Sequence, residues 1–121
     1  MAKILVVDDA EFVRVRLREM LTEMGFEVCE ANNGLLALDL CITEMPDLII
    51  CDINMPHMDG LEFLKTLMER DPEALVVMLS SNKDDAVLSQ CFLSGAQAYL
   101  LKPFNPEETY NTIAELLGIE Q

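Results

Sequence analysis

Three aspartates follow apolar runs that are typical of buried strands. Residues 3–12 read KILVVDDAEF, so a run of four apolar residues is followed at once by Asp8 and Asp9. A second apolar run, LIIC, ends in Asp52. Ionised carboxylates that gather at one place repel one another unless a cation compensates them. Because all three ligands offer oxygen, the pattern predicts a site for a hard divalent ion, Mg²⁺.

A hydroxyl and a lysine follow two further apolar runs. Ser80 comes after ALVVML, and Lys102 comes after AQAYLL. In an open parallel sheet, ligands bind beyond the carboxyl ends of the strands, so we expect both residues to lie beside the aspartates. For the aspartate pair alone, the alternative is that Asp9 caps the following helix while Asp8 is solvated. The additional presence of Asp52, Ser80 and Lys102 at strand ends favours the ion site.

Short apolar runs alternate five times with segments of helical periodicity. This alternation predicts an α/β fold with right-handed βαβ units and a parallel sheet covered by helices on both faces. A single domain is expected to span residues 1–121. We expect the first helix to bury a face made of Phe12, Val13, Leu17, Met20, Leu21 and Met24. The expected strands cover residues 3–7, 26–31, 47–52, 74–81 and 96–101, and the expected helices cover residues 11–25, 34–44, 59–70, 83–95 and 105–118.

Charge and composition exclude several classes of protein. The formal net charge of −14 would repel a polyanion, so no nucleic acid is expected as a partner. No apolar stretch reaches the roughly 20 residues needed to cross a bilayer, and the N-terminus lacks the pattern of a signal peptide. We therefore expect a cytoplasmic protein without membrane insertion. Cys29, Cys41, Cys51 and Cys91 show no CxxC spacing and His57 is the single histidine, which argues against zinc and favours buried, reduced thiols.

Four separated segments stand out, namely VVDDAEFVR (6–14), DLIICDINMPHMDGLEFL (47–64), LSS (79–81) and AYLLKPF (98–104). In order and spacing they resemble the receiver domain of two-component response regulators, in particular its stand-alone CheY-like type, and the resemblance covers essentially the whole chain. The resemblance implies a flavodoxin-like sheet of five parallel strands in the order 2-1-3-4-5, which places the first and third strands side by side.

The resemblance implies a chemical role for the acidic residues. Asp52 matches the phosphoacceptor, whose carboxylate takes a phosphoryl group from phosphohistidine on a sensor histidine kinase or phosphotransfer protein. Asp8 and Asp9 match the acidic pair that holds Mg²⁺ together with Asp52, and the backbone carbonyl of Asn54 matches a further ligand. The side chains of Asn54 and Asn82 are expected to tune how fast the aspartyl phosphate hydrolyses.

The resemblance also implies a conformational switch. Ser80 matches the hydroxyl that hydrogen-bonds the phosphoryl group, and Lys102 matches the lysine that pairs with it. Tyr99 matches an aromatic residue that moves inward on phosphorylation, and the bond between Lys102 and Pro103 is expected to be cis. The expected output is a reshaped surface of helix 4, strand 5 and helix 5 that binds a downstream protein, as in chemotaxis. The protein is expected to be a monomer, with dimerisation on activation left open.

Two other functions fit parts of the pattern. One is a Mg²⁺-dependent phosphatase with an aspartyl-phosphate intermediate, in which residues 52–54 (DIN) form a degenerate DxD motif. Against it, Asn54 replaces the second acid and no insertion could cap a substrate. The other is a flavodoxin-like cofactor binder, but the turn after the first strand lacks the small and hydroxyl residues that a phosphate loop needs. We therefore expect a signalling module and not an enzyme.

Overall fold

The computed structural model describes residues 1–81 and 85–119, and within them five strands and five helices alternate along the chain. The strands are β1 (Lys3–Val7), β2 (Glu27–Ala31), β3 (Leu48–Asp52), β4 (Val76–Ser80) and β5 (Ala98–Leu101). The helices are α1 (Glu11–Glu23), α2 (Gly34–Thr43), α3 (Gly60–Arg70), α4 (Asp85–Leu93) and α5 (Pro106–Leu117). The expected start of the fourth helix at residue 83, and Asn82, lie outside the described residues.

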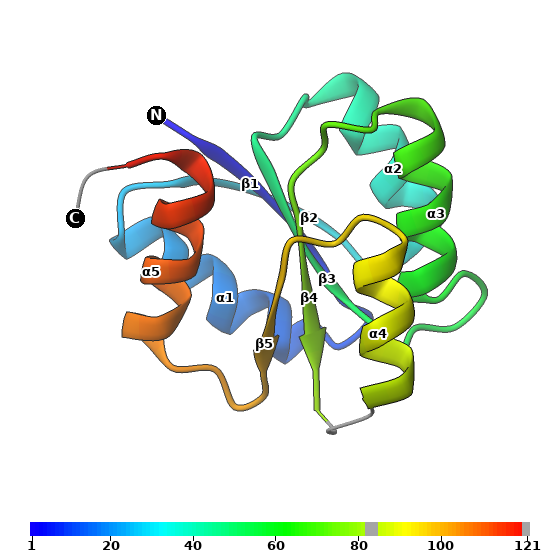
Figure 1. Cartoon of the computed structure of the whole chain (residues 1–121). Coiled ribbons are helices and arrows are strands. Elements are labelled where there is room, and N and C mark those ends of the chain that lie inside the picture. Colours follow the sequence, from blue (N-terminus) through cyan, green and yellow to red (C-terminus); the bar gives the residue numbers. More distant parts are fainter. Residues whose placement is uncertain (82–84, 120–121) are drawn as a thin grey trace.

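All five strands run parallel in one sheet of order β2-β1-β3-β4-β5 (Figure 1). This confirms the expected fold class and strand order. In the register, Val7 pairs with Cys51 and Asp52 pairs with Leu79. The carboxyl ends of β1, β3 and β4 therefore finish at the same edge of the sheet.

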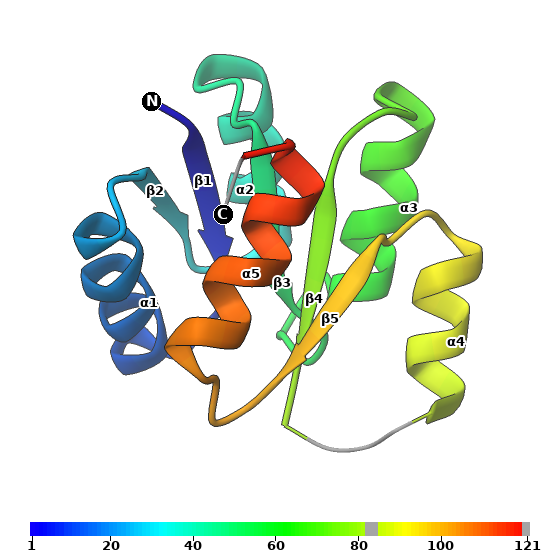
Figure 2. The same ribbon diagram turned by 60° about the vertical axis from the view of Figure 1, so that its left-hand side comes forward.

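Helices cover both faces of the sheet, with α1 and α5 on one face and α2, α3 and α4 on the other (Figures 1 and 2). Successive strand residues point to opposite faces. Accordingly, Leu5 and Val7 pack under α2 and α3, whereas Ile4 and Val6 pack under α1 and α5. Burial on both faces explains why this strand is apolar at four consecutive positions until the sheet ends.

Side-chain caps fix several helix boundaries. Asn33, Asp59 and Asn105 each accept a hydrogen bond from the backbone N–H three residues further on, at the starts of α2, α3 and α5. Gly118 ends α5 in the left-handed conformation, with φ of 72°. Helix α5 therefore begins after Asn105 and ends at Gly118, close to the range expected from the sequence.

The prediction that Phe12 belongs to the core is wrong. Val13, Leu17 and Leu21 are buried as expected, but 71% of the surface of Phe12 is exposed. A helix turns by about 100° per residue, so the residue before Val13 lies well away from the stripe that positions 13, 17 and 21 form. The expectation for the cysteines holds in part, because Cys51 and Cys91 are buried whereas the other two are only partly buried.

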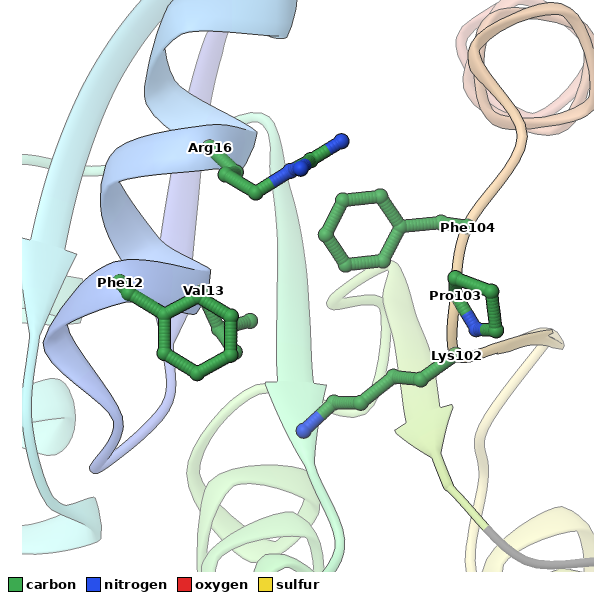
Figure 3. Close-up of a pocket in the computed structure, with 6 residues that line it drawn as sticks. All are labelled: Phe12, Val13, Arg16, Lys102, Pro103 and Phe104. Atoms are coloured by element: carbon green, nitrogen blue, oxygen red, sulfur yellow. The ribbon is translucent and has the colours of Figure 1, made fainter.

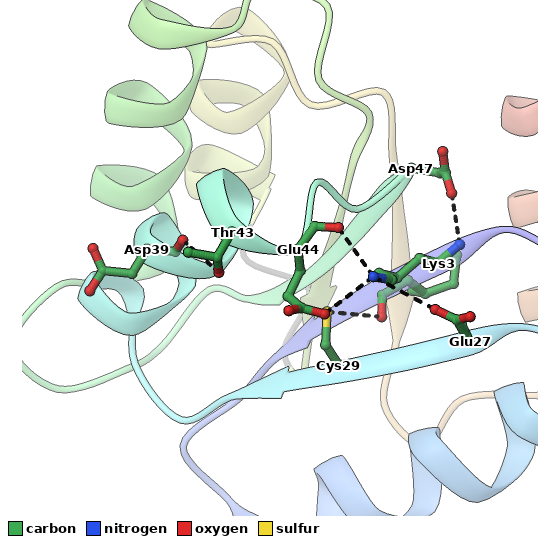
Figure 4. Close-up of polar contacts among 8 residues, drawn as sticks. Lys3, Glu27, Cys29, Asp39, Thr43, Glu44 and Asp47 are labelled. Atoms are coloured by element: carbon green, nitrogen blue, oxygen red, sulfur yellow. Dashed lines mark hydrogen bonds and ion pairs between the residues drawn. The ribbon is translucent and has the colours of Figure 1, made fainter.

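At the opposite edge of the sheet, acidic side chains are matched by Lys3 (Figure 4). Its ammonium group lies 3.2 Å from a carboxylate oxygen of Glu44 and 3.7 Å from one of Glu27. Its backbone N–H donates a hydrogen bond of 2.7 Å to Asp47. These contacts tie β1 to β2 and to the α2–β3 connection, at the edge away from the three clustered aspartates.

Close backbone approach makes Gly60 a sensitive position. A Cβ there would clash with the backbone oxygen of Asp52 and lie 2.8 Å from Cα of Ile53. We expect Gly60→Ala to lower the free energy of unfolding by roughly 1–3 kcal/mol in urea denaturation, because neither backbone can easily shift. Gly118→Ala is the control, because a Cβ at this position has no atom within 4 Å. It should lower the free energy of unfolding by only about 1 kcal/mol, through the positive φ of this residue. A smaller loss of unfolding free energy in Gly60→Ala than in Gly118→Ala would contradict the tight packing of Gly60 against the backbone of Asp52 and Ile53.

Candidate functional site

The three aspartates meet at the carboxyl edge of the sheet. Asp8 follows β1 directly and Asp52 ends β3, so the adjacency of these strands brings the two side chains together. One carboxylate oxygen each from Asp8, Asp9 and Asp52 lie within 4.8 Å of one another. Asp8 is fully buried and Asp52 is 5% exposed, whereas Asp9 lies at the surface. The structure thus brings together the acids that the strand-end pattern predicted.

Among the described residues, Lys102 is the cation that contacts the two buried carboxylates. Its Nζ lies 3.0 Å from Oδ2 of Asp8 and 3.4 Å from Oδ1 of Asp52. Burial lowers the pKa of Lys102, but its contact with Asp8 and the negative charges of both aspartates outweigh this, so the pKa is raised overall. The backbone N–H of Lys102 donates a 2.8 Å hydrogen bond to the carbonyl of Ser80, which holds the start of this loop against β4.

Hydrogen bonds fix the direction of Asp8. Its backbone N–H donates to the carbonyl of Ala31, and its Oδ1 accepts from the N–H of Ala10 at 2.9 Å. Oδ2 is buried and accepts no well-aligned hydrogen bond from the described residues, although Lys102 lies nearby. Helix α1 starts after Ala10 without a side-chain cap, so the alternative that Asp9 caps this helix is wrong. A buried carboxylate oxygen with spare acceptor capacity, beside two further carboxylates, fits a hard divalent cation.

The environment of Asp52 makes its negative charge unfavourable. Burial is the main reason that the pKa of Asp52 is raised to about 6, and the charge of Asp8 raises it further. Lys102 and the backbone of Asn54 act in the opposite direction but do not outweigh these two effects. Above pH 6 the carboxylate is thus ionised in a place where a cation or an electrophile would relieve its charge.

Of the remaining predicted residues, Ser80 and Asn54 lie at or just beyond the carboxyl ends of their strands, whereas Tyr99 lies further back along β5, paired with Met78. Ser80 ends β4 and is 3% exposed, and Asn54 is exposed two residues beyond β3. Tyr99 in β5 is 42% exposed and packs edge-on against Phe92 of α4, with ring centroids 6.1 Å apart. Tyr99 is therefore a surface ring and not an ordinary core residue. The bond between Lys102 and Pro103 is cis, as expected.

An apolar pocket of about 320 Å³ lies beside Lys102, between α1 and the β5–α5 loop (Figure 3). Sequence reasoning missed it, because it placed Phe12 in the core. Reasoning from the sequence also missed Arg14, whose guanidinium donates a hydrogen bond to the backbone oxygen of Asp8. The pocket is lined by Phe12, Val13, Arg16, Lys102, Pro103 and Phe104.

Comparisons with known proteins agree with this geometry. A sequence model of the response regulator receiver domain matches residues 4–114. Chemotaxis protein CheY of Thermotoga maritima is 34% identical over 92% of this chain and 93% of its own length. Sporulation initiation phosphotransferase F of Bacillus subtilis is 32% identical over 98% of this chain and 95% of its own. The structure of chemotaxis protein CheY4 of Vibrio cholerae superposes with a TM-score of 0.92 at 34% identity, covering 97% of this chain and 99% of that one.

Within residues 1–81 and 85–119, none of the helices combines the length and the apolar character needed to span a lipid bilayer.

The raised pKa of Asp52 predicts a pH-dependent cost to the metal-free fold. Between the ordinary pKa of 3.8 and the folded value of about 6, the folded state binds more protons than the unfolded state, so stability falls as pH rises through this window. We expect Asp52→Asn, in EDTA, to be more stable than the wild type at pH 8 by up to about 3 kcal/mol, with the difference vanishing near pH 4. Urea denaturation at a series of pH values measures this.

Asp39→Asn, on the exposed face of α2, is the matched control and should change stability by less than about 0.5 kcal/mol across the range. An Asp52→Asn protein that is less stable than the wild type at pH 8 would show that Lys102 fully compensates the buried charge.

Proposed function

Because the chain belongs to the response regulator receiver domain family, we propose that Asp52 accepts a phosphoryl group from a phosphorylated histidine of a sensor kinase or phosphotransfer protein. The observation that carries this proposal is the grouping of Asp52 with Asp8, Asp9 and Lys102 at one edge of the sheet. The chain is a signalling protein of the receiver type. A phosphatase is not favoured, because the chain aligns along nearly its whole length with receivers and chemotaxis proteins.

In the proposed reaction, a carboxylate oxygen of Asp52 attacks the phosphorus of phosphohistidine. The new bond is a carboxyl–phosphate bond, the P–N bond breaks, and its electron pair stays on the imidazole nitrogen, which takes up a proton. No general base is required, because a group with a pKa of about 6 is already ionised at neutral pH. Lys102, 3.4 Å from Asp52, would neutralise charge on the oxygens of the transferred group.

We assign the divalent site to Asp8, Asp9, Asp52 and the backbone carbonyl of Asn54. When bound there, Mg²⁺ would neutralise charge on the phosphoryl oxygens during transfer. The buried Oδ2 of Asp8 supports the assignment, since a cation gives this atom a partner. The three carboxylates then act as ligands, and Lys102 remains available to the phosphoryl group.

The proposed output is a change at the surface of α4, β5 and α5, where a downstream protein would bind. Shifting a two-state population from 1:99 to 99:1 requires about 5.5 kcal/mol of differential interaction. A hydrogen bond to a charged group contributes roughly 1.5–3 kcal/mol, so contacts of the phosphoryl group with Ser80, Lys102 and a backbone amide reach this size. The exposed Tyr99, packed against Phe92, is the ring that would move inward.

On this proposal, residues 1–121 act as one cytoplasmic receiver domain that is monomeric before activation. The chemotaxis proteins among its relatives favour a chemotaxis-like output, and the sporulation phosphotransferase favours a place in a phosphorelay. These two outputs share the same phosphoacceptor chemistry and differ only in the protein that the phosphorylated chain contacts.

Loss of the nucleophile should abolish phosphorylation. We expect Asp52→Asn to incorporate no ³²P from a phosphohistidine donor, and Lys102→Met to incorporate it about 10²-fold more slowly because one charge-stabilising donor is lost. Autoradiography of the intact protein measures both. Asp39→Asn should be labelled at the wild-type rate. Full labelling of Asp52→Asn would refute the assignment of the phosphoacceptor.

The switch should depend on Ser80 separately from phosphorylation. The chain has two tyrosines and no tryptophan, so in a Tyr110→Phe background the tyrosine fluorescence reports on Tyr99 alone. We expect beryllofluoride with Mg²⁺ to change this fluorescence, and Ser80→Ala to remove most of the change while beryllofluoride still binds. Ser81→Ala, at an exposed neighbouring position, is the control. An unaltered response in Ser80→Ala would exclude this residue from the switch.

A further inference from the structure

Arg14 connects the acidic site to the neighbouring strand. It lies on α1 with its side chain 15% exposed, and its Nη1 donates a 2.7 Å hydrogen bond to the backbone oxygen of Asp8. Its Nε lies 3.3 Å from a carboxylate oxygen of Glu30 in β2. The other oxygen of Glu30 lies 2.6 Å from Nη1 of Arg18, one turn further along α1. The carbonyl of Asp8 is thus held by a guanidinium that is itself held in place.

The contact with Arg14 constrains two carboxylates at once. A peptide unit is planar, so the carbonyl of Asp8 and the N–H of Asp9 lie in one plane. The preceding peptide is fixed as well, because the N–H of Asp8 donates to the carbonyl of Ala31 in β2. With both flanking peptides held, the backbone angles of Asp8 are set. The direction of the Asp8 side chain and the position of the Asp9 Cα, from which the second carboxylate leaves the chain, are set with them.

Arg14 and Lys102 act on different atoms of Asp8. Lys102 contacts the carboxylate oxygen Oδ2, whereas Arg14 contacts the backbone oxygen. Because Glu30 offsets the charge of Arg14 and the guanidinium leaves the carboxylate free, Arg14 does not compete with a cation for its ligands. The role that remains for Arg14 is geometric.

We propose that Arg14 is a positioning residue that orients the Asp8–Asp9 peptide and thereby gives the acidic site its preference for Mg²⁺ over Ca²⁺. Mg²⁺ requires near-ideal octahedral geometry, whereas Ca²⁺ accepts variable geometry and ligand number. Loosening the two aspartates therefore weakens Mg²⁺ binding more than Ca²⁺ binding. The inference rests on the magnesium site proposed above.

Isothermal titration calorimetry of the full chain with MgCl₂ and with CaCl₂ tests this inference. We expect Arg14→Met to raise the Kd for Mg²⁺ about 10-fold, the size typical of lost support for a metal ligand. The Kd for Ca²⁺ should rise by no more than about 2-fold, because its coordination adapts. Arg14→Lys should fall between the wild type and Arg14→Met, since an ammonium cannot hold Glu30 and the Asp8 carbonyl as a planar fork does.

Arg18→Met is the matched control. It removes the second arginine that forms an ion pair with Glu30, and it leaves the hydrogen bond from Arg14 to the backbone oxygen of Asp8 in place. It should keep both affinities within about 2-fold of the wild type, as expected for an exposed pair. A general loss of protein stability would weaken the binding of Mg²⁺ and of Ca²⁺ by the same factor. The ratio of the two Kd values therefore separates a positioning role of Arg14 from simple destabilisation. If Arg14→Met does not fold, the ratio of the Kd values for Mg²⁺ and Ca²⁺ in Arg14→Lys tests the inference instead.

Arg14 variants that keep the wild-type ratio of Mg²⁺ to Ca²⁺ affinity would overturn the inference and leave the proposed function intact. A wild-type protein that binds no Mg²⁺, or an Asp8→Asn protein that binds it as well as the wild type, would overturn the magnesium site itself and the inference with it.

Discussion

Among the described residues, two buried carboxylates, those of Asp8 and Asp52, face one ammonium group, that of Lys102, at 3.0 and 3.4 Å. One positive charge cannot fully offset two negative charges in a place where burial already disfavours ionisation. For this reason the pKa of Asp52 is raised to about 6 by burial and by the charge of Asp8, although Lys102 lowers it. The neighbouring strand residues are apolar and buried on both faces, so the carboxylates cannot turn into the core. Within the described residues part of the negative charge stays unmatched, and on the proposed function a bound cation or the phosphorylation of Asp52 would relieve it.

The parallel sheet creates this situation through its register. Because β1 and β3 are neighbours and Val7 pairs with Cys51, the residues that follow, Asp8 and Asp52, leave the sheet side by side. At the other edge, Lys3 lies among acids that are largely exposed, and solvent screens those charges. Both edges therefore carry acids beside a lysine, but at the Lys3 edge the charges are screened by solvent and at the carboxyl edge they are buried. Reactivity at the carboxyl edge comes from burial combined with proximity.

Alternating periodicities were sufficient to predict the α/β class, and strand ends were sufficient to predict which residues meet. Strand order was not derivable in this way, since alternation fits several orders, and it came from the resemblance to receivers. Phe12 was misplaced because apolar spacing on a helix shows that a face exists but does not show where its edges lie against the sheet. The contact of Arg14 with a backbone carbonyl leaves no mark in the sequence, because it depends on how α1 lies over β2.

The shared lysine links the events at the site in the proposed mechanism. Without a cation, Lys102 is engaged by Asp8, and moving it towards a phosphoryl group would leave a fully buried carboxylate uncompensated, which costs several kcal/mol. A divalent cation bound by Asp8 would remove that cost. On the proposed mechanism, cation binding and phosphoryl recognition by Lys102 would therefore favour each other, and by linkage the effect would be reciprocal. The backbone hydrogen bond between Lys102 and Ser80 joins the loop that carries the lysine to the end of β4. On the proposed mechanism, a movement of Lys102 towards the phosphoryl group would therefore act on a loop that is hydrogen-bonded to Ser80, the residue proposed for the switch.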